Sequence, residues 1–163
     1  MEKSAGRMKN MFKQSEIKSA VLFEIAIYGV FLFVAGLVLP ALLIFIIRFT
    51  GYSEIVEEIA KALVVLFLIL NFPSLKQKIG AGILFGFLFG LSENSFYLNQ
   101  IFQLGDFSVF WQRFLWTVPM HIITVLVMVF AGSVKKWVLI FGLTGAIILH
   151  ALFNGIVVAF LMR

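Results

Sequence analysis

The sequence predicts an all-α protein, a polytopic transmembrane helix bundle of about five spans. Of its 163 residues 62% are hydrophobic and 13% are charged, and the mean hydropathy is +1.08. Soluble domains carry about 25% charged residues. Several apolar runs reach the roughly 20 residues that a spanning helix needs, twice the length of a strand in a membrane barrel. The absence of cysteine excludes a disulfide framework.

The apolar runs follow one another with short connections between them. The first runs from about residue 20 to 47 and is expected to bend at Pro40. The others cover about residues 54–72, 79–98, 114–131 and 137–162. Residues 1–19 form a basic tail that is either cytoplasmic and solvated or lies in the membrane interface. Residues 20–163 form a single transmembrane domain.

Basic residues indicate the orientation of the bundle. They concentrate in the tail and in the turns after the second and fourth spans, at Lys76 and Lys135. These three segments share one side if five spans alternate, so the N-terminus is expected in the cytoplasm and the C-terminus outside. Such flanking charges are typical of contacts with membrane lipid. No basic stripe with interleaved exposed aromatics is present, so no nucleic-acid partner is expected.

Polar side chains inside the spans are the main functional signal. Each ionisable group costs roughly 2.5–3.5 kcal/mol at the membrane centre and therefore needs a reason. We expect Glu24 and Glu54, near span ends, to be interfacial. The remaining candidates are Glu57, Glu58 and Lys61 in the second span, Glu93 and Asn94 in the third, Arg113 and His121 in the fourth, and His150 and Asn154 in the fifth.

Helical spacing places these groups together. With about 1.5 Å of rise per residue, they lie roughly 5–18 Å below the outer ends of alternating spans. In the third span Gly82, Gly86 and Gly90 form a ridge that admits a neighbouring helix, and Glu93 follows on that face. The sequence therefore predicts one polar site, shared by four helices, in the outer half of the bilayer.

The residue types suit water activation. A glutamate can take a proton from water as general base, and imidazole and amide groups can donate to a developing oxyanion. The same groups could hold zinc, with Glu58, Glu93, His121 and His150 as candidate ligands. Because no H-E-x-x-H motif is present, we favour a metal-free site and keep zinc as the possible cofactor.

Four segments resemble the motifs of PrsW-type intramembrane proteases, within the larger CAAX-protease-like superfamily. Residues 57–61 (EEIAK) resemble the family's E-E-x-x-K motif, and residues 86–94 resemble its glycine-rich helix that ends in Glu-Asn. Residues 113–121 and 150–154 (HALFN) resemble the third and fourth motifs. The four occur in the family's order, and the resemblance covers a protease-like core of about residues 53–158.

The resemblance implies a glutamic-type or metal-dependent intramembrane peptidase of a prokaryotic cell membrane, acting on a membrane-spanning or membrane-associated protein. Glu57 and Glu58 would hold the base, with His121 as its partner, while His150 and Asn154 would stabilise the intermediate. The supporting residues would be Lys61, Glu93, Asn94 and Arg113. The sequence does not distinguish Glu57 from Glu58 as the base. The alternative is a non-catalytic scaffold or receptor subunit that binds partner spans along the glycine ridge.

Overall fold

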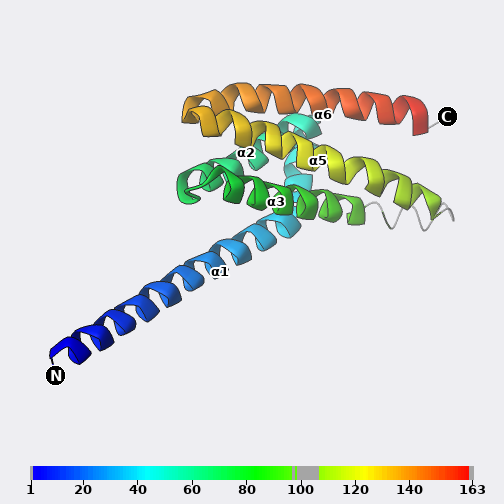
Figure 1. The fold of residues 1–163 in the computed structure, drawn as a ribbon. Helices are drawn as coiled ribbons and strands as arrows, with labels where there is room; N and C mark the ends of the chain where they lie inside the picture. The colour runs from blue at the N-terminus through cyan, green and yellow to red at the C-terminus, as the bar shows by residue number, and fades with distance from the viewer. Residues whose placement is uncertain (1, 97, 99–106, 162–163) are drawn as a thin grey trace. The chain divides into compact units, whose positions relative to one another are not determined.

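A computed structural model describes residues 2–96, 98 and 107–161 (Figure 1). The described chain is helical throughout and contains no strand, which confirms the predicted all-α class. Its elements are α1 (Glu2–Thr50), α2 (Ser53–Asn71), α3 (Leu75–Phe96), α5 (Ser108–Val134), the short 3₁₀ helix η1 (Lys136–Val138) and α6 (Leu139–Leu161).

The chain divides into two compact units, residues 1–31 and residues 32–163. The first unit is the N-terminal part of α1, in which the Tyr28 hydroxyl donates a hydrogen bond to Glu24. Helix α1 continues without a break past residue 19, where the sequence predicts the end of the tail, and remains helical through Pro40. The second unit contains the whole of the protease-like core predicted for residues 53–158.

Within the described part of the chain, four helices are long and apolar enough to cross a membrane: Leu22–Thr50, Leu75–Phe96, Phe110–Val134 and Lys136–Ile156. Helix α2 has 19 residues, but its first three turns contain Glu54, Glu57, Glu58 and Lys61. Its role as a fifth span therefore stays a prediction, as do the sides of the membrane on which the termini lie. The multi-pass character of the protein does not depend on α2.

Helix α5 lies at the centre of the second unit, where it packs against α2, α3 and α6. In Figure 1 it runs in the opposite direction to α3 and α6. Much of the core between these helices is an apolar cluster. Its fully buried members include Val65 and Leu68 of α2, Phe85 of α3, and Val125 of α5.

The glycine ridge of α3 brings the backbone of α5 unusually close. A Cβ atom added to Gly86 would lie 2.8 Å from the Cα atom of Ile122 and 3.0 Å from the carbonyl oxygen of His121. One at Gly90 would lie 2.9 Å from the Cα atom of Val118. The ridge therefore packs against a helix of its own chain. It is not free to bind a partner span, which the scaffold alternative requires.

Gly86→Ala is expected to destabilise the second unit by about 1–3 kcal/mol, because the added methyl group meets backbone that cannot rotate away. Gly80→Ala, on the same helix with nothing within 4 Å of the new methyl group, is the matched control. Thermal unfolding in detergent measures the difference. Equal midpoints for the two variants would show that α3 and α5 are not packed this closely.

Candidate active site

Lys61 lies at the centre of a buried polar cluster built by α2, α3, α5 and α6. Its side chain is fully buried. The Nζ atom lies 2.6 Å from Glu58 Oε1 and 2.6 Å from His121 Nδ1, and 4.0 Å from Glu57 Oε2. It also lies 4.5 Å from the ring centroid of Phe89. Ion pairing, hydrogen bonding and a cation–π contact thus replace the water that the ammonium group would otherwise bind.

Glu58 links this ammonium group to α6. Its Oε1 atom also accepts a hydrogen bond of 2.7 Å from His150 Nδ1. Glu58 is fully buried and His150 is 2% exposed. Because an ionised carboxylate only accepts, this contact requires a proton on His150 Nδ1, and in that tautomer of the neutral ring Nε2 is the acceptor.

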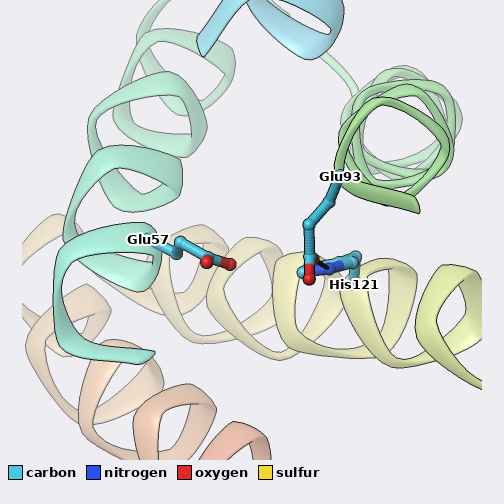
Figure 2. A group of neighbouring side chains, drawn as sticks. All are labelled: Glu57, Glu93 and His121. Carbon is cyan, nitrogen blue, oxygen red and sulfur yellow. Dashed lines mark hydrogen bonds and ion pairs between the residues drawn. The ribbon is translucent and has the colours of Figure 1, made fainter. Parts of the chain in front are cut away.

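His121 is held at both ring nitrogens. The Lys61 ammonium group can only donate, so His121 Nδ1 accepts from it and Nε2 donates to Glu93 Oε2. The ring packs against Phe89 and lies edge-on to the His150 ring, with centroids 5.4 Å apart. Figure 2 shows Glu93 and His121 meeting from α3 and α5, with the carboxylate of Glu57 directed toward them from α2.

The two adjacent glutamates of α2 have different surroundings. Glu58 uses one oxygen to hold Lys61 and His150. Glu57 is also buried, yet its Oε2 atom has no hydrogen-bond partner within the described part of the chain, and its ion pair with Lys61 is the longer one. Glu58 Oε2 is likewise buried without a partner among the described residues. What distinguishes Glu57 is its position, because its carboxylate lies close to both Glu93 and His121.

Glu57, Glu93 and His121 could together hold a metal ion, since each offers a ligand atom and these atoms lie within 4.8 Å of one another. Carboxylate oxygen and imidazole nitrogen are both zinc ligands, although the common hydrolytic set of this kind has two imidazoles and one carboxylate. The sequence-based ligand set contained Glu58 and His150, and the structure instead joins these two residues to each other.

The charge of the cluster also fits a divalent cation. When ionised, Glu57, Glu58 and Glu93 face the single ammonium group of Lys61, which leaves two buried negative charges unbalanced. Buried charge of one sign is strongly unfavourable without a counter-charge. A metal ion bound at His121 Nε2 would replace the proton that this atom donates to Glu93. Either protons or a metal ion could therefore balance the negative charge of the cluster.

Asn154 lies one helical turn beyond His150, and its Nδ2 atom donates a hydrogen bond of 2.8 Å to Glu54 Oε1. Glu54 is half-buried and reaches across to α6, instead of extending to the interface as its position at the helix mouth predicts. The sequence signal that identifies Glu54 is its spacing from Glu58. The two residues are four positions apart and therefore share one face of α2.

The two remaining candidates lie on the same helices as the cluster. Asn94 follows Glu93 and extends the glycine ridge by one turn. It is fully buried, and neither polar atom of its amide has a hydrogen-bond partner in the portion of the chain that the structure describes. Arg113 is half-buried on α5, two turns before His121 and on the same face.

One known protein family matches most of the chain. The profile of the PrsW family intramembrane metalloproteases matches residues 19–162, nearly the whole chain. The chain belongs to this family. No curated protein and no solved structure matches it. The predicted resemblance is confirmed, and the PrsW assignment makes the chain an integral membrane protein of a family of intramembrane metalloproteases.

Proposed function

We propose that this PrsW protein hydrolyses a peptide bond of a membrane-spanning or membrane-associated protein, with the attacking water held between Glu57, Glu93 and His121. The observation that carries the proposal is the convergence of Glu57 with a carboxylate and an imidazole from two other helices, since the buried Oε2 atom of Glu57 has no hydrogen-bond partner among the described residues. Such a carboxylate can accept a proton from water as general base. Glu58, whose Oε1 atom holds both Lys61 and His150, then acts as a positioning residue.

The same three side chains would hold the metal ion that the family's description implies. With zinc held by these residues, the site would gain the polarisation that makes water nucleophilic at neutral pH. In either case the chain's own residues orient the site: Lys61 fixes the ring of His121, and Glu93 fixes its other nitrogen. The chelation experiment described below distinguishes a metal-dependent site from a metal-free one.

His150 and Asn154 complete the proposed reaction on the α6 side. His150 is oriented by Glu58 and can accept a proton at Nε2, then donate it to the oxyanion or to the leaving nitrogen. Asn154 uses one hydrogen of its amide for Glu54 and retains a second one for the oxyanion. Water thereby adds to the carbonyl carbon, the C–N bond breaks, and the products are a carboxylic acid and an amine.

The position of the cluster supports a site near one membrane face. It is built from the first turns of α2, the last turns of α3, the first half of α5 and the second half of α6. All of these lie toward one end of the second unit. The distribution of basic residues in the sequence favours the outer half of the bilayer for that end, and we propose this as the depth of cleavage.

The test is a cleavage assay with the purified protein in liposomes. The substrates are synthetic membrane-spanning peptides with a fluorophore and a quencher on either side of their outer half. We expect cleavage toward the outer face, loss of cleavage with 1,10-phenanthroline, and recovery with excess Zn²⁺. Cleavage that persists under the chelator would assign water activation to the carboxylates alone. Failure of the protein to cleave any peptide, with or without Zn²⁺, would contradict the proposed function.

A further inference from the structure

Helices α2 and α6 are joined by two polar contacts that repeat with the helical period. The inner contact joins Glu58 to His150 at 2.7 Å, and the outer contact joins Glu54 to Asn154 at 2.8 Å. On each helix the two residues are four positions apart, so both contacts lie on one face of α2 and one face of α6. The inner contact belongs to the proposed machinery, whereas no role has so far been given to Glu54.

We propose that Glu54 is a positioning residue of the active site, which sets the direction of the Asn154 side-chain amide. The inference rests on the proposed function, in which Asn154 stabilises the oxyanion. An asparagine side chain can turn about its last torsion, so its donor hydrogens point in a useful direction only if something holds the group. Glu54 supplies this restraint by accepting one of the two Nδ2 hydrogens.

The chemistry of the pair favours this role over a purely structural one. A carboxylate accepts only, so it determines that nitrogen rather than oxygen faces α2. A hydrogen bond to an ionised acceptor is also stronger and shorter than one between neutral groups. The second hydrogen of Nδ2 is then directed at a fixed angle from the first.

Activity measurements with four variants test the proposal: Glu54→Ala, Glu54→Gln, Asn154→Ala and the Glu54→Ala/Asn154→Ala double variant. Loss of orientation at a reacting group costs up to about 10²-fold in rate. We expect Glu54→Ala to lower kcat about 10- to 100-fold with little change in KM. Glu54→Gln keeps an acceptor oxygen and should retain most of the activity. The double variant should be no slower than Asn154→Ala. Glu24→Ala, which removes an exposed glutamate from the first unit, is the matched control.

A spectroscopic measurement tests the contact without relying on catalysis. The ¹⁵N side-chain amide signals of Asn154, assigned by their absence in Asn154→Ala, should shift in Glu54→Ala and return toward the wild-type position in Glu54→Gln. Unchanged signals in Glu54→Ala would overturn the inference.

The outcomes also separate the two proposals. Full activity in Glu54→Ala together with loss in Asn154→Ala would overturn the role of Glu54 and leave the proposed function intact. Full activity in Asn154→Ala would remove the oxyanion role from the proposed function. Independent, multiplying losses in the double variant would show that Glu54 does not act through Asn154, and would overturn the inference.

Discussion

Glu57→Gln is expected to lower kcat/KM for peptide cleavage by about 10²–10⁴-fold, the range attributed to general-base catalysis. The substitution keeps the shape of the side chain and removes its ability to take a proton from water or to ligate a metal as a carboxylate. Because Glu57 makes only the long ion pair with Lys61, the unfolding midpoint should change little. Cleavage in liposomes and thermal unfolding in detergent measure the two effects.

Glu58→Gln is the informative comparison, since the two glutamates are adjacent and both buried. This substitution weakens the contacts to Lys61 and His150, so activity and stability should fall together. Retention of at least half of the wild-type activity in Glu57→Gln would contradict the assignment of Glu57. Loss of activity only in Glu58→Gln would exchange the roles of the two residues.

Lys61→Met is expected to lower the free energy of unfolding by about 3–5 kcal/mol, the cost of leaving a buried ion without its partner. Methionine fills a similar volume, so the loss reports on charge and hydrogen bonding rather than on a cavity. Glu58 would lose its ammonium partner, and His121 would lose the donor that fixes its ring. Denaturation of the protein in detergent by increasing sodium dodecyl sulfate gives the difference in free energy.

Two further variants give this prediction its controls. Lys76→Met removes an exposed lysine and should leave stability unchanged. The Lys61→Met/Glu58→Gln double variant removes both charges of the buried pair, so it should be more stable than Lys61→Met alone. Equal stability of the Lys61→Met and wild-type proteins would show that the ammonium group is not buried as described.

The sequence predicts the helical class and the shared polar face because both follow from periodicity. The ridge of Gly82, Gly86 and Gly90 predicts a close helix contact, and the structure identifies α5 as its partner. The same ridge carries Glu93 to His121. Spacing and family motifs are thus enough to predict, from the sequence alone, that these residues lie close together.

The pairing inside the cluster could not be predicted in this way. Glu57 and Glu58 can both reach Lys61 from a helix, at spacings of four and three residues, and the choice depends on how the other helices fill the space around them. His150 approaches Glu58 from α6 and leaves Glu57 to face Glu93 and His121. The group of side chains that could hold a metal ion therefore contains Glu57, whereas the predicted candidate ligands were Glu58, Glu93, His121 and His150.

Glu54 illustrates a second limit. A glutamate at the mouth of a span has the same local sequence whether it extends to the interface or crosses to a neighbouring helix. Only the position of Asn154 on α6 distinguishes the two cases. The same limit applies to the prediction that α2 spans the membrane. Its hydropathy is lowered by Glu57, Glu58 and Lys61, and these are side chains that the bundle buries.

The central claim is that four helices bring acid, imidazole and amide groups into one buried cluster around Lys61. An experimental structure of the wild-type protein in a lipid nanodisc, at a resolution that shows side chains, tests it most directly. We predict Lys61 Nζ within hydrogen-bonding distance of both Glu58 and His121, and Glu57 facing the Glu93–His121 pair. Side chains separated by packed Phe and Leu residues, or directed toward lipid, would contradict the account.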